Sequence, residues 1–270
     1  MRLISLNAWG GNLYEPLAAY LASVNADILC LQEVTWAAEP TPEKVFFRNH
    51  GFDLAQHEDL FAALSKTLTN HQGQFLPASQ GDVVDEAGNP FLSRFGLATF
   101  VHRDIALAGQ AHDFVHGAYV ADGWGTPPVP RNMHALRLIE PQTGKPFIAA
   151  HLHGLRDPAG KHDTPDRVRQ AERIVELLLA LRRNDEPMIL CGDLNLLPDS
   201  ATFDRLAEIG LKDLVTANGF TDTRTSLYEK PQRYADYLLV TPGIEVQDFD
   251  VVAEPEVSDH RALLLDFVVA

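Results

Sequence analysis

The sequence predicts a layered α/β protein. Short runs of β-branched and aromatic residues alternate with amphipathic helical stretches, and there are too many such runs for a simple helix bundle. The 270 residues, 46% of them hydrophobic and 22% charged, can bury a substantial core. No repeat, low-complexity segment or linker marks a boundary, so we expect one continuous domain over residues 1–270.

The chain opens with a predicted strand, helix and strand. Arg2–Ala8 is the first strand, Glu15–Val24 follows with apolar residues at helical spacing, and Asp27–Val34 is the second strand. Gly, Pro or Asp residues bound many of the later runs, as is typical of strands that end in turns. These further strands are predicted at Phe95–His102, Arg131–Ile139, Phe147–Leu152, Met188–Cys191, Tyr237–Val240, Val246–Val252 and Leu263–Val269.

The longest predicted helix is Pro165–Arg183. Thr164 is a suitable cap for it, and Pro165 suits its first turn because a proline there loses no helical hydrogen bond. Its expected apolar face comprises Val168, Ala171, Val175, Leu178 and Leu179.

The segment Thr35–Arg94 does not show a comparable pattern. Four prolines interrupt it, and only Leu60–Leu68 has helical spacing. We expect this segment to form loops and short elements above the functional end of the sheet, where specificity-determining segments are common.

The charge balance limits the classes of partner. With 22 Lys and Arg against 37 Asp and Glu, the formal net charge is −15, so the average field repels polyanions and disfavours tight non-specific binding to duplexes. A local basic groove or bound divalent ions could still overcome that field. Nothing in the sequence indicates an obligate protein partner.

The expected compartment is the cytoplasm. The opening residues lack the features of a secretory signal, and no apolar run approaches the length that crosses a membrane, so no membrane insertion is expected. Cys30 and Cys191 lie inside apolar segments, which is typical of reduced, buried thiols.

Five short clusters concentrate residue types that bind metals and transfer protons: SLNAW, LQEV, AAHLH, CGDLN and VSDH. Each lies at or just beyond the end of a predicted strand. Strand ends that meet at one edge of a sheet bring distant side chains into a single pocket. The candidate side chains are Asn7, Glu33, His151, Asp193, Asn195, Asp259 and His260, with Asp236 in RYADYLL in support.

The ordered series of clusters resembles the endonuclease/exonuclease/phosphatase superfamily, which includes deoxyribonuclease I-like and exonuclease III-like proteins. The matching order runs from Asn7 to His260 and so spans nearly the whole chain. The resemblance implies a four-layer α/β/β/α sandwich, in which two packed, mostly antiparallel sheets are flanked by helices. It also implies hydrolysis of phosphoesters that depends on a divalent metal.

Glu33 is the leading candidate metal ligand, since a hard carboxylate oxygen suits Mg²⁺ or Mn²⁺. Asn7 can add a neutral oxygen, and Asp259 can reach the ion directly or through water. Some relatives carry an acidic or amide group two residues after the first Asn, whereas this chain has Trp9. We therefore expect one principal ion.

The catalytic candidates form two pairs. Asp193 and Asn195 lie two residues apart, so both can project toward one face. The resemblance implies that Asp193 orients or deprotonates the attacking water and that Asn195 donates a hydrogen bond to the phosphate. Asp236 is the candidate that orients the His260 imidazole. Asp193 and His260 remain alternative general bases.

The remaining candidates would contact substrate. The resemblance assigns a phosphate contact to His151, while His153 either contacts substrate or is structural. Arg131 is a candidate phosphate clamp, because a guanidinium group makes bidentate contacts with phosphoryl oxygens. Arg156, with the nearby Lys161, could grip a compact anion.

The sequence favours a phosphodiesterase or nuclease in which activated water attacks phosphorus in line and no covalent enzyme intermediate forms. The alternative is a phosphatase acting on a small phosphorylated metabolite or lipid headgroup, which the acidic charge balance supports. The substrate would accordingly be a small molecule or a nucleic acid. A noncatalytic binding module is less favoured because every main catalytic position is intact.

Overall fold

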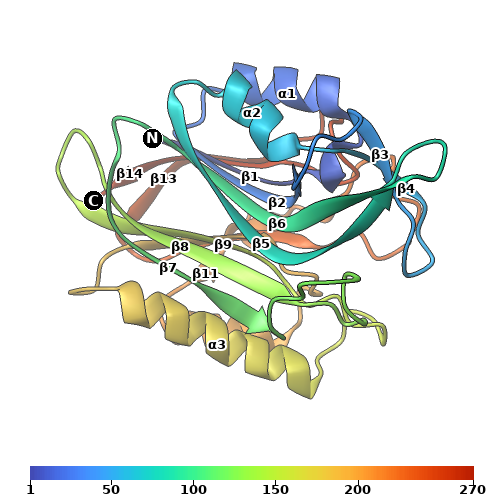
Figure 1. The fold of residues 1–270 in the computed structure, drawn as a ribbon. Coiled ribbons are helices and arrows are strands. Elements are labelled where there is room, and N and C mark those ends of the chain that lie inside the picture. Colours follow the sequence, from blue (N-terminus) through green and yellow to red (C-terminus); the bar gives the residue numbers. More distant parts are fainter.

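The computed structural model describes residues 1–270 and contains two β-sheets packed face to face (Figure 1). The larger sheet comprises β1 (Arg2–Asn7), β2 (Ile28–Ala37), β3 (Lys44–Phe47), β4 (Leu54–His57), β5 (His71–Val84), β6 (Pro90–His102), β13 (Ile244–Val251) and β14 (Leu263–Val269). Its eight strands lie in the order β13-β14-β1-β2-β6-β5-β3-β4. Both ends of the chain therefore contribute to the same sheet.

The smaller sheet comprises β7 (Ala106–His116), β8 (Arg131–Ile139), β9 (Pro146–His153), β10 (Met188–Asp193), β11 (Lys212–Asp213) and β12 (Asp236–Val240). Its order is β11-β12-β10-β9-β8-β7. Each sheet has one parallel pair, β1 with β2 and β9 with β10, and every other pairing is antiparallel. The expectation of mostly antiparallel sheets is confirmed.

Helices cover the outer faces of both sheets. They are the 3-10 turn η1 (Trp9–Gly11) and the α-helices α1 (Tyr14–Ser23), α2 (Leu60–Thr67), α3 (Pro165–Leu181), α4 (Ala201–Ala207) and α5 (Leu214–Ala217). Figure 1 shows α1 and α2 on the larger sheet and α3 on the smaller one, which gives the predicted four-layer α/β/β/α sandwich. None of these helices is both long and apolar enough to cross a membrane.

The main core lies between the sheets. The larger cluster of buried apolar side chains has 38 members drawn from both sheets, whereas a second cluster of 17 lies beneath α1 and α2. Phe147 of β9 and Phe267 of β14 meet edge to face in the larger cluster, with ring centroids 5.7 Å apart. Burial of apolar surface between the sheets therefore fixes their relative position.

The expectation for Thr35–Arg94 is wrong in its main part. This segment contains β3, β4 and the 14-residue β5, although α2 lies where helical spacing was seen. Pro77 is accommodated because the pairing of β5 with β6 shifts register between Pro77 and Ser79, and Pro90 is the first residue of β6. Prolines at a bulge and at a strand start remove few ladder hydrogen bonds.

The helix α3 begins as predicted, but its buried face differs from the predicted one. The Thr164 side chain accepts a hydrogen bond from the backbone N–H of Arg167, as a cap should. Val168 and Leu179, however, are 50% and 46% exposed, so they do not belong to the buried face. That face is completed by polar side chains that hydrogen-bond inward, including Gln170.

Candidate active site

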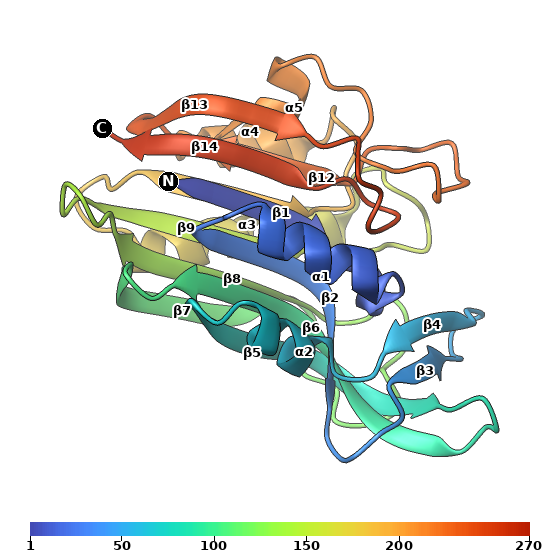
Figure 2. The same ribbon diagram turned by 90° about the horizontal axis from the view of Figure 1, so that it is seen from above.

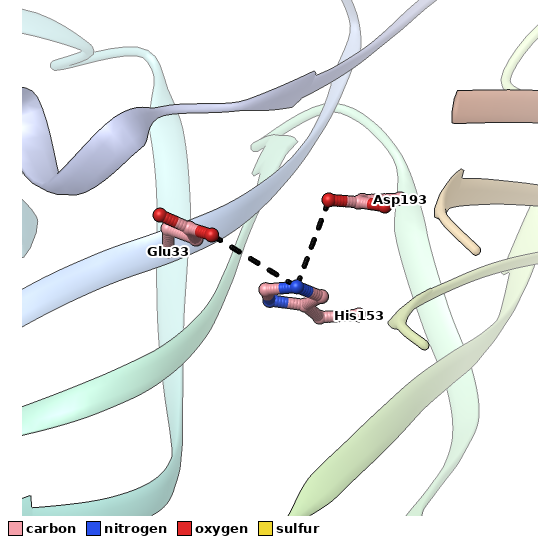
Figure 3. Close-up of side chains that lie close together, drawn as sticks. All are labelled: Glu33, His153 and Asp193. Carbon is pink, nitrogen blue, oxygen red and sulfur yellow. Dashed lines mark ion pairs between the residues drawn. The ribbon is translucent and has the colours of Figure 1, made fainter. Parts of the chain in front are cut away.

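Three candidate residues form a row across the smaller sheet. His153 pairs with Asp193 in the β9–β10 ladder, and Asp193 pairs with Asp236 in the β10–β12 ladder. Directly paired residues on neighbouring strands project their side chains to the same face. Figure 3 shows His153 and Asp193 converging with Glu33, which comes from the larger sheet. The candidate site therefore lies where the two sheets meet at their strand ends.

Glu33 reaches the site because β2 is irregular there. The pairing of β2 with β6 shifts between Leu31 and Val34, and Glu33 has a φ of 55°, so the bulge re-aims its side chain. Its Oε1 lies 3.9 Å from Nε2 of His153. Burial raises the pKa of Glu33, and a hydrogen bond from Asn7 opposes that rise.

Asp193 lies at the centre of the cluster. Its Oδ2 accepts a hydrogen bond from Asn7 Nδ2 at 3.0 Å and lies 3.6 Å from Nε2 of both His153 and His260. Its Oδ1 accepts from the backbone N–H of Asn195 at 3.1 Å, which forms an Asx turn. Gly192 precedes it with a φ of 132°, and a side chain there would overlap the Leu152 carbonyl. A glycine before Asp193 is therefore required.

His260 is held by Asp236. Its Nδ1 lies 2.8 and 2.9 Å from the two carboxylate oxygens, so it donates a hydrogen bond to Asp236. Burial, and then the charge of Arg224, lowers the pKa of His260 to about 4. The imidazole is therefore neutral at neutral pH. The remaining nitrogen, Nε2, faces Asp193 and accepts a hydrogen bond from Arg224.

The structure does not bring His151 to this cluster. Its Nδ1 lies 3.3 Å from Gln32 Nε2, its Nε2 lies 2.7 Å from Thr99 Oγ1, and only 1% of the residue is exposed. Both ring nitrogens are therefore engaged in the interior. The phosphate contact expected of His151 must be corrected, because the strand pairing places His153, two residues later, beside Asp193.

Basic side chains surround the carboxylates. Arg131 begins β8 and is 6% exposed, with Nη1 3.4 Å from Nδ1 of His153. Arg156 is exposed and stacks on Phe52, with its guanidinium carbon 5.0 Å from the ring centroid. Lys161 is 9% exposed, and its amine donates to the Tyr234 carbonyl. Burial lowers the pKa of Lys161 to about 8.

Arg224 is a site residue that the sequence did not indicate. It lies in the segment between α5 and β12, pairs with His260 in an isolated β-bridge, and donates to Asp259 Oδ2 at 2.8 Å. No strand pattern or motif surrounds it in the sequence. Its place in the site therefore follows from long-range contacts with His260 and Asp259.

The donor set fits a hard divalent cation. Glu33 and Asp193 oxygens and a His153 nitrogen lie within 4.8 Å of one another, and one carboxylate oxygen of Asp259, Oδ1, is buried without a hydrogen-bond partner. Asp259 also lies close enough to Glu33 and Asp193 for their charges to raise its pKa, after the larger effect of burial. Oxygen-rich donors of this kind suit magnesium or manganese.

A family model described as Endonuclease/Exonuclease/phosphatase family matches residues 4–260. The chain belongs to this family. Family members hydrolyse phosphoesters and generally depend on a divalent metal, which agrees with the donor set around Glu33 and Asp193. The match spans every motif from the first strand to His260.

The chain also resembles individual curated and solved proteins. The uncharacterized protein YbhP of Escherichia coli K12 is 25% identical over 219 residues, which cover 81% of this chain and 73% of YbhP. An endonuclease/exonuclease/phosphatase structure from Bacteroides vulgatus covers 100% of this chain and 98% of its own, with a TM-score of 0.71 at 16% identity. The mannosyl-6-phosphatase Bt3783 of Bacteroides thetaiotaomicron covers 99% of both chains, with a TM-score of 0.69 at 17% identity. At these identities, the structures establish the shared fold.

Proposed function

We propose that this family member is a phosphoester hydrolase dependent on Mg²⁺ or Mn²⁺, in which activated water attacks phosphorus in line. The observation that carries the proposal is the convergence of Asn7, Glu33, His153 and His260 on Asp193. Each comes from a different part of the chain, and packing between the sheets holds them in place. Such preorganisation is what a catalytic site requires.

Glu33, Asn7 and Asp259 are the proposed ligands of one principal ion. Bound there, magnesium or manganese would act as a Lewis acid toward the phosphoryl oxygens. The raised pKa of Glu33, due to burial, is consistent with a carboxylate whose charge lacks compensation in the chain alone. Asn7 links the ligands to the reacting groups because it contacts both Glu33 and Asp193.

Asp193 is the better placed of the two candidate bases. Asn7 and the Asn195 backbone fix its carboxylate, which retains further lone pairs for a water proton. The Nε2 lone pair of His260 already accepts a hydrogen bond from Arg224. We therefore assign proton removal to Asp193. His260, oriented by Asp236, accepts a hydrogen bond from Arg224 and so positions that guanidinium group beside the reacting phosphoryl group.

The negative charge that develops on the phosphoryl oxygens is met by hydrogen-bond donors. Asn195 has a φ of 54° and donates its amide only weakly, to the Gly154 carbonyl at 3.4 Å. His153 of β9 and the adjoining Arg131 of β8 approach the same space from the β9 side of Asp193. Donors placed before reaction stabilise the transition state at little reorganisation cost.

The decisive experiment is a hydrolysis assay on a panel of phosphodiesters, phosphomonoesters, nucleotides and nucleic acids with Mg²⁺ or Mn²⁺. Turnover should disappear with EDTA, and Asp193→Asn should lower kcat by about 100-fold or more while the far-ultraviolet spectrum is unchanged. Asp199→Asn, at an exposed position after the same strand, is the matched control and should retain full turnover. Absence of metal-dependent turnover across the panel would favour a noncatalytic binding module and refute the proposal.

A further inference from the structure

We infer that the substrate is a phosphomonoester whose terminal phosphoryl group is received by Arg131, Lys161 and Arg224. The inference rests on the proposed function and deepens it by choosing between diester and monoester. The sequence favoured a diester. The arrangement of basic side chains around Asp193 favours the monoester.

Three cations at the site have no carboxylate partner. No ion pair in the structure includes Arg131, Arg156 or Lys161, although carboxylates are abundant on this protein. Arg131 is 6% exposed, and its Nε is buried without a hydrogen-bond partner; Nε of Arg224, also 6% exposed, is equally unpaired. A buried guanidinium donor without a partner is costly, so the Nε–H groups of Arg131 and Arg224 are free to donate to an anionic ligand.

The two buried arginines lie on opposite sides of Asp193. Arg131 contacts His153, and Arg224 contacts His260, while each of these histidines lies 3.6 Å from the same Asp193 oxygen. Arginine presents several donors in one plane, which match pairs of phosphoryl oxygens. A phosphoryl group in front of Asp193 would therefore meet a guanidinium group on either side.

Aromatic rings restrain two of the cations, Arg224 and Arg156. Tyr228 lies 4.1 Å from the guanidinium carbon of Arg224, and Phe52, which is 45% exposed, lies 5.0 Å from that of Arg156. Stacking on a ring restricts the plane of a guanidinium group. The donors are therefore oriented before substrate arrives, which lowers the entropic cost of binding.

The basic groups at the site suit a dianion. Arg131, Arg156, Lys161 and Arg224 gather around the carboxylates, and a divalent metal ion would add two positive charges. A monoester dianion presents two negative charges and three terminal oxygens to these donors, whereas a diester carries one charge and has one fewer terminal oxygen.

The remaining surface favours a compact ligand over a polymer. The net charge of −15 means that the protein as a whole repels polyanions. A small phosphomonoester needs only the site cations. A nucleic-acid strand would also need phosphate contacts beyond them.

The test compares para-nitrophenyl phosphate with bis-para-nitrophenyl phosphate, using the full chain and Mn²⁺. We expect kcat/KM for the monoester to exceed that for the diester by about 10-fold or more, since one added charged hydrogen bond has that effect. Lys161→Gln and Arg224→Gln should each lower this ratio by about 10-fold and weaken competitive inhibition by inorganic phosphate. Lys145→Gln, at an exposed position on the turn between β8 and β9, is the control and should change neither.

The outcomes separate this inference from the function on which it rests. Metal-dependent turnover with a preference for the diester would overturn the monoester assignment and leave the hydrolase in place. An unchanged ratio and unchanged phosphate inhibition in both folded variants would overturn the assignment of Lys161 and Arg224. Failure to hydrolyse either ester, together with failure on the wider panel, would refute the hydrolase itself.

Discussion

Thr99 joins two buried histidines in the interior, since its Oγ1 lies 2.7 Å from both His134 Nδ1 and His151 Nε2. A hydroxyl has one proton to donate, so it donates to one ring and accepts from the other. Thr99→Val keeps the shape but removes both hydrogen bonds, and we expect it to lower the free energy of unfolding by about 1–3 kcal/mol. Urea denaturation measures the change. The exposed Thr69→Val is the control, and an equal effect in both variants would contradict the argument.

Glu33 lies next to that interior network, because His151 contacts Gln32, the neighbouring residue in the β2 bulge. Glu33→Gln removes the charge of the proposed principal ligand while keeping its size. The concentration of Mn²⁺ that gives half-maximal turnover should rise by about 10-fold or more. Metal affinity falls by that factor even when only the groups that support a ligand are changed. A metal titration at saturating substrate checks this. An unchanged titration curve would remove Glu33 from the proposed metal site.

That Asp193 and His260 lie together in the candidate site could be predicted, because each belongs to a motif near a strand end. The sequence could not show that His153, rather than His151, lies beside Asp193. That depends on the register of the β9–β10 ladder, which pairs His153 with Asp193 and His151 with Cys191. Arg224 was missed for a similar reason. Its partner, His260, lies 36 residues away, and no local pattern encodes that contact.

At the scale of elements, an ion pair ties β8 to the turn before β10. Arg137 donates to Glu186 from Nε at 2.8 and 2.9 Å and from Nη2 at 2.5 Å, and the Glu186 side chain is 6% exposed. Glu186→Gln should lower the free energy of unfolding by about 1–3 kcal/mol at neutral pH. Glu176→Gln, which breaks an exposed pair with Arg173, should cost less than about 0.5 kcal/mol.

The effect of Glu186 should depend on pH with a defined sign. The hydrogen bond from Arg137 holds the pKa of Glu186 below its usual value, so the folded state binds a proton less readily than the unfolded state. The stabilisation is present above the unfolded pKa of about 4.3 and is lost as the pH falls through the folded pKa. The free energy of unfolding should therefore be measured for wild type and Glu186→Gln at pH values of about 7 and about 4. The difference between the two proteins should be smaller at the lower pH. A difference that grows on acidification would contradict this ion pair.

Some elements could not be predicted because the physical signal is weak in the sequence. The strand β7 is an edge strand whose residues are mostly exposed, so it lacks the apolar alternation that marked the central strands. The strand β5 was hidden by Pro77, which is tolerated only because a register shift lies there. Conversely, β1 and β10 are buried along nearly their whole length, and their apolar runs were recognised.

At the scale of the whole molecule, the two sheets form the walls between which the site is assembled. Glu33 and Asn7 belong to the larger sheet, whereas His153, Asp193 and Asp236 belong to the smaller one. Figure 2 shows the β3–β4 hairpin and the segments before β12 and β14 projecting at one end of the sandwich. Any shift of one sheet against the other would separate proposed metal ligands from the proposed base. Stability of the interface between the sheets and integrity of the site are therefore coupled.

That coupling bears on the single domain expected over residues 1–270, which remains a prediction. Trp9 and Trp36 lie in or beside the larger sheet, and the third tryptophan, Trp124, packs against that sheet and donates a hydrogen bond to the Asp82 carbonyl of β5. Tryptophan fluorescence therefore reports on the larger sheet, while far-ultraviolet circular dichroism reports on both sheets. Because both sheets share one core, the two signals should give coincident urea transitions. Phe147→Ala should lower the free energy of unfolding by about 3–5 kcal/mol, and the milder Ile148→Val should lower it by about 0.5–1.5 kcal/mol, with both signals changing together. Transitions that separate, or a variant that shifts circular dichroism while leaving tryptophan fluorescence in place, would show that the sheets unfold independently and that the chain is not one cooperative domain.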